Sequence, residues 1–197
     1  KILKIPFIIY ENNLIVGKTN RYLLPYAKKM FVSYPEVEIG SVEHNSKIEV
    51  IGNIIRENIL KFKENKKFEK EIISILILGG SQAASIFAKK LPYIFLKCSK
   101  ENIKLKIFQQ CLLNQQDQLI DYYNSSNIDC EIFNFSNNIL SYFSKSDLAI
   151  TRSGASMLAE LLNCRLPIIS IPLPTSADNH QLKNAKYFVN KGYGFLI

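Results

Sequence analysis

The strongest constraint on the fold is a nearly continuous apolar run, Ile72-Ile73-Ser74-Ile75-Leu76-Ile77-Leu78. Such a run suits a strand that is buried on both faces, as strands are in a parallel sheet covered by helices. It ends at Gly79-Gly80-Ser81 and passes directly into a pattern of helical period. Pro92 lies inside that pattern, and we expect it to break or kink the helix.

Apolar strands alternate with helical stretches on both sides of this run. Further strands are expected at residues 7–9, 30–32, 47–51, 105–108, 130–133, 148–151, 168–171 and 195–197. Helices are expected at residues 21–29, 112–123, 139–143, 156–162 and 181–191. The polar stretch from Arg56 to Glu71 is expected to contain a domain connection. The alternation predicts an α/β protein with a parallel, doubly wound sheet.

Composition and spacing argue against several functions. The formal net charge is +8, but the basic residues are spread along the chain and form no motif, so no nucleic-acid partner is expected. Weak attraction to an anionic membrane surface stays open. The four cysteines and two histidines lack metal or redox spacing, so we expect reduced thiols in a cytosolic protein and no metal site. No apolar run reaches the ~20 residues that span a bilayer, and no signal peptide is recognisable.

Three strand-to-helix junctions carry residues suited to a ligand, which such sheets bind at the carboxyl ends of their strands. The first is Gly79-Gly80-Ser81-Gln82. Paired glycines let the backbone approach an anion, and the next helix offers free N–H groups. A tight turn that needs glycine for its own geometry explains this junction equally well.

The second junction is Thr151-Arg152-Ser153-Gly154-Ala155-Ser156. Small residues at the helix start leave its amides open to a ligand. Arg152 can pair with a phosphate or with a neighbouring acid. Glu160, about one turn into the helix, can accept two hydrogen bonds from a ribose diol, or simply stabilise the helix N-terminus.

The third junction runs from Ile171 through Pro174 to Gln181. Asp178 and Gln181 have the spacing of a capping box, so both can be structural. The amide of Gln181 also suits a sugar hydroxyl. His180 is more often a surface or cap residue than a catalyst.

Five motifs, in order, resemble the MurG family of bacterial N-acetylglucosaminyltransferases. The three junctions supply Gly79-Gly80-Ser81-Gln82, Arg152-Ser153-Gly154-Ala155, and Pro172-Leu173-Pro174 with the following Ala177-Asp178-Asn179-His180-Gln181 and Asn184-Ala185. Upstream, Tyr10-Glu11-Asn12-Asn13 and Gly52-Asn53-Ile54-Ile55-Arg56 match two further family motifs. The chain departs from the family pattern at Tyr10, Asn12, Ile54 and Ala83.

The resemblance implies a GT-B glycosyltransferase fold. Residues 1–53 would be the C-terminal part of a Rossmann-like acceptor domain, and residues 54–197 a Rossmann-like donor domain with a parallel sheet. The implied UDP-N-acetylglucosamine-binding residues are Asn13 and Arg56 at the interdomain cleft, Ser81 on the diphosphate, Ser136 on uracil, the segment Ala155, Ser156, Met157, Leu158, Ala159 and Glu160 with Glu160 on the ribose, and Gln181 on the sugar.

The implied activity is inverting transfer of N-acetylglucosamine from its UDP donor to undecaprenyl-diphosphate-muramoyl-pentapeptide in peptidoglycan synthesis. The resemblance implies no cofactor, no metal ion, and a peripheral position on the cytoplasmic face of the bacterial inner membrane. Both ends of the chain are expected to be cut, so the catalytic base is expected to lie outside it, with Glu11 a weak alternative. By itself, the fragment is expected to be inactive.

Other functions stay open: a GT-B transferase for another nucleotide sugar, a non-catalytic nucleotide-binding module, and, least favoured, an oxidoreductase, because GxGxxG is missing.

Overall fold

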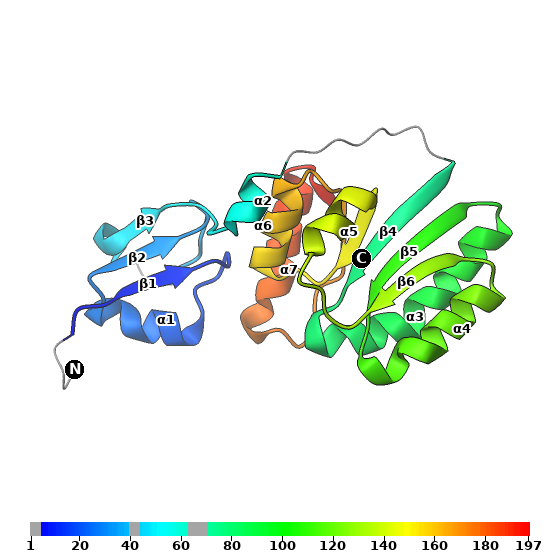
Figure 1. Ribbon diagram of the computed structural model, residues 1–197. Helices are drawn as coiled ribbons and strands as arrows, with labels where there is room; N and C mark the ends of the chain where they lie inside the picture. Colours follow the sequence, from blue (N-terminus) through cyan, green and yellow to red (C-terminus); the bar gives the residue numbers. More distant parts are fainter. Residues whose placement is uncertain (1–4, 40–43, 63–70) are drawn as a thin grey trace.

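The computed structural model describes residues 5–39, 44–62 and 71–197, without the side chains of residues 81–84. The described residues form two parallel sheets, one of three strands and one of six (Figure 1). The smaller sheet is built from the N-terminal part of the chain. The larger sheet holds the long apolar strand and the three junctions.

The small sheet has the order β1-β2-β3, with β1 at Ile8–Glu11, β2 at Lys29–Val32 and β3 at Ile48–Val50. Its core contains Ile9, Met30 and Val32. Helix α1 spans Lys18–Leu23, and a 3-10 turn, Leu24–Tyr26, follows it. The helix expected at 21–29 is therefore misplaced. Pro25 has no N–H to donate to a helix and is accommodated at the start of the 3-10 turn.

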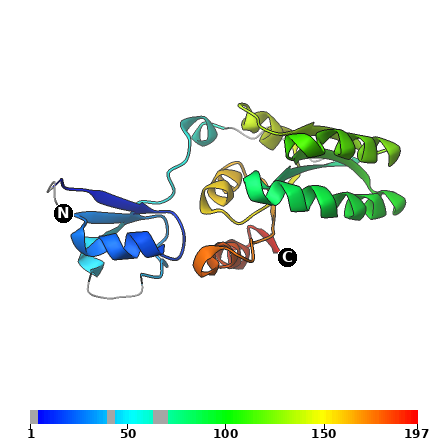
Figure 2. The same ribbon diagram turned by 90° about the horizontal axis from the view of Figure 1, so that it is seen from below.

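The linker after β3 leads into the short helix α2, Glu57–Leu60 (Figure 2). Tyr10 fixes the start of this linker. Its hydroxyl donates to the carbonyl oxygen of Gly52 at 3.3 Å, and accepts from the backbone N–H of Ile54 at 2.9 Å. Gly52 has φ +83°, a left-handed conformation that glycine adopts without strain.

The large sheet has the order β6-β5-β4-β7-β8-β9, and every pairing in it is parallel. Its strands are β4 (Ile72–Leu78), β5 (Lys104–Gln110), β6 (Asp129–Phe133), β7 (Leu148–Thr151), β8 (Ile168–Ser170) and β9 (Gly194–Leu196). The chain builds outward from β4 to β6, then returns to the other side of β4 with β7. The order reverses between β4 and β7, and ligands bind at such a switch point.

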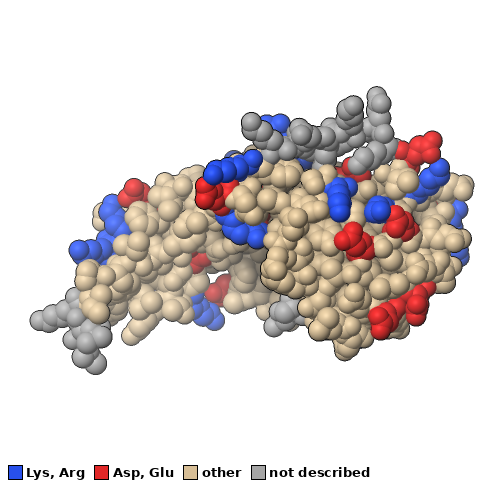
Figure 3. All heavy atoms as spheres, in the orientation of Figure 1, with Lys and Arg blue, Asp and Glu red and all other residues tan. Residues whose placement is uncertain are grey.

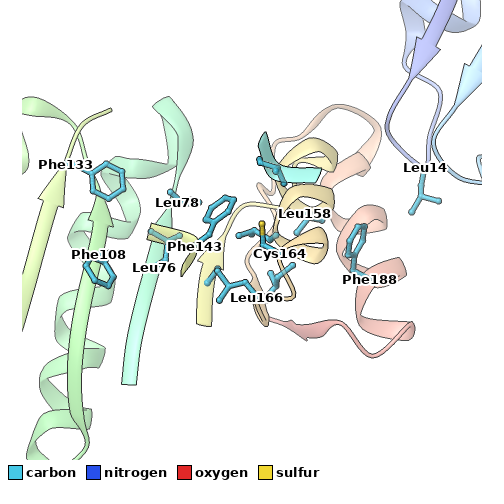
Figure 4. Packing of buried hydrophobic residues seen from close by; sticks show 14 of the residues in the cluster. Leu14, Leu76, Leu78, Phe108, Phe133, Phe143, Leu158, Cys164, Leu166 and Phe188 are labelled. Carbon is cyan, nitrogen blue, oxygen red and sulfur yellow. The ribbon is translucent and has the colours of Figure 1, made fainter. Parts of the chain in front are cut away.

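Helices cover both faces of this sheet, which confirms the predicted doubly wound fold. On one face, α3 (Gly80–Lys100) and α4 (Gln116–Ser125) pack on Ile75 and Ile77 of β4. On the other, α5 (Ile139–Lys145), α6 (Ala155–Asn163) and α7 (His180–Asn190) pack in the cluster that contains Leu76 and Leu78 (Figure 4). The apolar run is thus buried on both faces, except for its first two residues.

Helix α3 continues through Pro92, so the expected break does not occur. Proline removes only one hydrogen bond of the helix, the one to the carbonyl of residue 88. Phe87, Leu91 and Phe95 are buried on the same side of α3 and hold it against the sheet on both sides of the proline. Tertiary packing therefore outweighs the local preference.

The two sheets share part of one hydrophobic core. Leu14, from the loop after β1, and Tyr34, from the segment after β2, belong to the cluster formed by α6 and α7. Figure 4 shows Leu14 on the side of the cluster where Phe188 of α7 lies. No helix among the described residues is long and apolar enough to cross a membrane.

Candidate functional site

The three junctions meet at one pocket of about 420 Å³, at the carboxyl ends of the central strands. Gly79 and Gly80 follow β4 and Gln110 ends β5. The rest of the lining comes from the end of β4, from the end of β7 through the start of α6, and from Leu173 and the start of α7; it includes Leu78, Thr151, Arg152, Gly154, Met157, Leu173 and Gln181. This is the switch point of the sheet, so the fold and the sequence motifs indicate the same ligand site.

At the first junction, α3 begins at Gly80, whose φ is +61°. The backbone N–H of Gly80 donates to Oε1 of Gln110 at 3.3 Å. Gln110 in turn donates to the carbonyl oxygen of Asn134 at 3.2 Å. The candidate Ser81 lies in the first turn of α3, but its side chain is outside the described part of the structure.

At the second junction, Gly154 caps α6, and no side-chain cap hydrogen bond forms at this helix start among the described residues. A Cβ added to Gly154 would meet open space. The free N–H groups and the helix dipole together favour an anion here. The sequence-based expectation that these amides are open to a ligand stays a prediction.

Arg152 contacts backbone carbonyl groups rather than the neighbouring acid that the sequence offered as one alternative. Its Nη1 donates to the carbonyl oxygens of Ile171 at 3.0 Å and Pro172 at 2.9 Å, and its guanidinium lies 5.0 Å from the ring centroid of Phe87. Within the described ranges no carboxylate pairs with it. Burial lowers the pKa of this guanidinium below its ordinary value. Arg152 therefore joins the second and third junctions and adds a positive charge to the pocket lining.

Glu160 lies just beyond the first turn of α6, about where the sequence placed it, and the first turn holds no acidic residue. Its buried carboxylate accepts two hydrogen bonds from Arg56, Nε to Oε1 at 2.8 Å and Nη2 to Oε2 at 2.7 Å. This hydrogen-bonded pair raises the pKa of Arg56 above its ordinary value. Two candidates 104 residues apart are thus in contact, outside the lining of the pocket.

The remaining candidates on α6 divide by burial. Ala155, Leu158 and Ala159 are buried, and none of them lines the pocket. Met157 lines the pocket. Ser156 is exposed, and its Oγ accepts a hydrogen bond from Asn12 Nδ2 at 3.0 Å, which brings the loop after β1 to the start of α6.

At the third junction, the capping box is not formed. Helix α7 begins at His180, and its cap, Asn179, is left-handed with φ +54° and makes no side-chain cap bond. The side chain of Gln181 instead accepts from the backbone N–H of Leu173 at 2.9 Å and lines the pocket. His180 bonds through Nδ1 to the carbonyl oxygen of Ala177 at 2.8 Å, a local structural contact.

Two further candidates, like Glu160 and Arg56, lie outside the pocket lining. Ser136, between β6 and α5, accepts from the backbone N–H of Asn138 at 3.1 Å. Asn13 donates to Oε1 of Glu11 at 2.9 Å and accepts from Nδ2 of Asn184 at 3.0 Å. Sequence reasoning missed this role of Asn184, although the Asn184-Ala185 motif had marked the position.

Glu11, the weak alternative for a base, holds the loop after β1 in place. Its two carboxylate oxygens accept four hydrogen bonds, from the backbone N–H groups of Asn13 and Gly17 and from the side-chain amides of Asn13 and Asn20. The side chain is 4% exposed. These contacts describe a structural carboxylate. Across the described part of the chain no group of His, Cys, Asp and Glu side chains could hold a metal ion.

Two parallel α/β sheets, with a pocket at the switch point of the larger one, fit the GT-B class of glycosyltransferases that the sequence predicted. Residues 74–197 match the model of the glycosyltransferase family 28 C-terminal domain. The chain belongs to this family.

Proteins similar in sequence and structure match all or nearly all of this chain. A Pelagibacter ubique protein named as a UDP-N-acetylglucosamine–N-acetylmuramyl-(pentapeptide) pyrophosphoryl-undecaprenol N-acetylglucosamine transferase is 36% identical over 197 residues, which are 100% of this chain and 55% of that protein. A Rickettsia felis protein of the same name is 38% identical over 99% of this chain and 57% of its own length. The crystal structure of Acinetobacter baumannii MurG superposes with a TM-score of 0.79 at 27% identity, covering 100% of this chain and 54% of that one. The chain thus spans about half the length of the relatives it matches.

Proposed function

We propose that this chain is the donor-binding part of an enzyme that transfers N-acetylglucosamine from UDP-N-acetylglucosamine to undecaprenyl-diphosphate-muramoyl-pentapeptide. The observation that carries the proposal is the pocket at the switch point. It brings together the starts of α3 and α6, the Arg152 guanidinium and the Gln181 amide, and no acidic residue is among the described residues that line it. Such a lining suits a diphosphate joined to a sugar.

The chemistry of the site follows from charge. A UDP leaving group carries negative charge, which is stabilised by pre-oriented amides and a partly desolvated guanidinium. The N–H groups at the start of α6 and the backbone of Gly79 and Gly80 are suited to this role. The attacking hydroxyl of the acceptor needs a general base, and our proposal places that base in a part of the enzyme outside this chain.

For the other candidate residues we propose the roles that the family resemblance implies. The Oε1 atom of Gln181 accepts from the backbone N–H of Leu173, so its Nε2 donors stay available for sugar hydroxyls. Glu160 contacts the ribose, Ser81 the diphosphate and Ser136 the uracil, while Asn13 and Arg56 border the cleft. Residues 1–53 belong to the acceptor domain and residues 54–197 to the donor domain.

The proposed partners are a lipid-linked acceptor and an anionic membrane surface, which place the enzyme at the cytoplasmic face of the membrane. Nucleic acid is not a proposed partner. On the face seen in Figure 3, lysine and arginine side chains are interspersed with acidic ones and do not form a continuous strip. Recognition of a nucleic-acid backbone uses such a strip.

Isothermal titration calorimetry of the 197-residue chain with UDP, UDP-N-acetylglucosamine, UDP-glucose and NAD tests the proposal. We expect binding of UDP and a preference for the N-acetylglucosamine donor over UDP-glucose. Preference for NAD, or no binding of any uridine nucleotide, would overturn the proposal. Binding of UDP with no discrimination between the two sugars would favour a general nucleotide-binding module.

A further inference from the structure

Asn184 is the most deeply buried polar side chain that connects the two sheets. It lies on α7 and is 1% exposed. A primary amide has two N–H donors and one carbonyl acceptor, and burying it without partners is costly. Each of these groups has a partner in the structure, so the position is built around this side chain.

The three partners come from two distant segments. The Oδ1 atom of Asn184 accepts from the backbone N–H of Leu14 at 3.2 Å. Its Nδ2 atom donates to Oδ1 of Asn13 at 3.0 Å and to the carbonyl oxygen of Ser153 at 3.1 Å. Asn13 and Leu14 belong to the loop after β1, whereas Ser153 precedes the cap of α6. One amide therefore joins the small sheet to the turn that offers its amides to the pocket.

Further hydrogen bonds fix both ends of this connection. Asn13 is held by the buried carboxylate of Glu11. The hydroxyl of Ser153 lies 2.7 Å from that of Ser170 at the end of β8. A fully satisfied buried network of this kind has one preferred arrangement, because any displacement leaves a polar group unpaired.

We propose that Asn184 is a positioning residue that sets the separation between Asn13 and the β7–α6 turn, and thereby holds the donor site in its binding-competent form. This inference rests on the proposed function for its ligand. Asparagine meets the geometric demand because it supplies two donors and one acceptor. Aspartate keeps the acceptor for Leu14 but, when ionised, has no donor for Asn13 or Ser153.

The substitution Asn184→Asp converts this geometry into a pH-dependent readout. Above the pKa of the introduced carboxyl, its negative charge lies against Oδ1 of Asn13 and the carbonyl oxygen of Ser153, which accept hydrogen bonds from Asn184 in the wild-type chain. At lower pH the protonated carboxyl can donate one hydrogen bond, and burial raises the pKa of such a group toward the accessible range. The titratable and charged groups tied to this region are Glu11, His180 on the preceding turn of α7, and Lys183, which pairs with Glu38. All of them are retained in the variant, so the wild-type chain is the reference at each pH.

The experiment is calorimetry with UDP-N-acetylglucosamine at pH 8 and pH 5 on the wild-type chain, Asn184→Asp and Asn163→Asp. Asn163 is the matched control, since its Nδ2 also donates to a backbone carbonyl oxygen, that of Ile59 at 2.7 Å, away from the pocket. Relative to wild type at the same pH, we expect Asn184→Asp to bind about tenfold more weakly at pH 8, and to recover most of this loss at pH 5. The affinity of Asn163→Asp should equal that of wild type at both pH values.

Hydrogen exchange on the wild-type chain and Asn184→Asp without ligand supplies a readout that does not depend on the proposed function. Segments 13–16 and 152–156 should lose protection together in the variant at pH 8 and regain it together at pH 5. In the wild-type chain both segments should gain protection together on addition of UDP-N-acetylglucosamine.

Wild-type affinity of a folded Asn184→Asp variant at pH 8 would overturn the inference, as would exchange in which one segment changes without the other. If Asn184→Asp does not fold, hydrogen exchange on the wild-type chain shows whether segments 13–16 and 152–156 change protection together or separately. Absence of nucleotide binding by the wild-type chain with coupled exchange intact would instead refute the proposed function.

Discussion

At the scale of single residues, the carboxylate of Glu160 has a partner before any ligand arrives. The bidentate pair with Arg56 shows that this carboxylate can accept two parallel donors, which is also what a ribose diol offers. We expect Glu160→Gln to weaken UDP binding by ~1–3 kcal/mol, the usual cost of losing hydrogen bonds to a charged group. Calorimetry checks this, with thermal unfolding to show that the variant is folded. Unchanged affinity in a folded variant would remove Glu160 from the site.

The same pair predicts unequal losses of stability. The side chain of Glu160 is 12% exposed and that of Arg56 is 53% exposed. Arg56→Met leaves a mostly buried carboxylate without its charged donors, at a cost of ~1–3 kcal/mol, whereas Glu160→Gln leaves an arginine that water can reach. In urea denaturation we therefore expect Arg56→Met to be the less stable variant. Equal losses would mean that the buried carboxylate is solvated in another way.

Residue types and their place after strands were predictable from the sequence, but their partners were not. Arg152 was recognised as a cation at a junction. That it stacks on Phe87 and binds two backbone carbonyl groups depends on α3 and the segment after β8, which are distant in sequence. Glu160 was recognised as an acceptor of paired donors, yet its donor in the structure is Arg56 from the linker.

At the scale of elements, two glycines are compared. Gly194 leaves room for the neighbouring strand, whereas Gly154 lies at the pocket. A Cβ on Gly194 in β9 would lie 2.1 Å from the carbonyl oxygen of Ile168 in β8, so Gly194→Ala must push the edge strand away. We expect a stability loss of ~1–3 kcal/mol, measured by thermal unfolding. Gly154→Ala is the control, because its Cβ meets open space and only the smaller cost of losing a good cap residue applies. A loss for Gly194→Ala no larger than that of Gly154→Ala would contradict the structure.

Strand positions were predictable because apolar β-branched runs are a local signal, whereas helix ends depend on other parts of the fold. The strand at Ile72–Leu78 has the predicted bounds. Pro92 does not break α3, because the buried residues on both sides of it pack on the sheet. Around Pro25 the α-helix does give way to a 3-10 turn that ends at Tyr26, earlier than apolar periodicity indicated. A local pattern cannot show which of two prolines will be overruled by packing.

At the scale of the whole molecule, α7 holds the two sheets together by contacts that no sequence pattern contains. Lys183 pairs with Glu38, and Lys191 with Glu36 at 3.5 Å. All four side chains are at least 40% exposed, so each pair contributes little and is screened by salt. The buried contacts of Asn184, Leu14 and Tyr34 therefore contribute most of the stability of the contact between the two sheets. Sequence predicted an α/β protein and a domain connection, but not which faces meet.

Tyr34 links the contact between the two sheets to the pH dependence of the free energy of unfolding. Its ring packs 5.0 Å from that of Tyr187, and its hydroxyl accepts from Asn53 Nδ2 at 3.1 Å. Burial raises the pKa of Tyr34 to about 12, from an ordinary value of 10.0. Between these values the unfolded chain binds fewer protons than the folded one, so the free energy of unfolding falls as pH rises. For this residue the fall amounts to about 2–3 kcal/mol.

We expect Tyr34→Phe to be slightly less stable than wild type at neutral pH, since Asn53 loses a partner, but to lose stability less steeply between pH 10 and 12. Tyr142, whose pKa burial also raises to about 12, is retained and keeps part of the slope. Urea denaturation across this range measures the slopes, with Tyr22→Phe as the control because Tyr22 is 73% exposed. Parallel slopes for wild type and Tyr34→Phe would show that the phenol is hydrated, and hence that the two sheets do not enclose it.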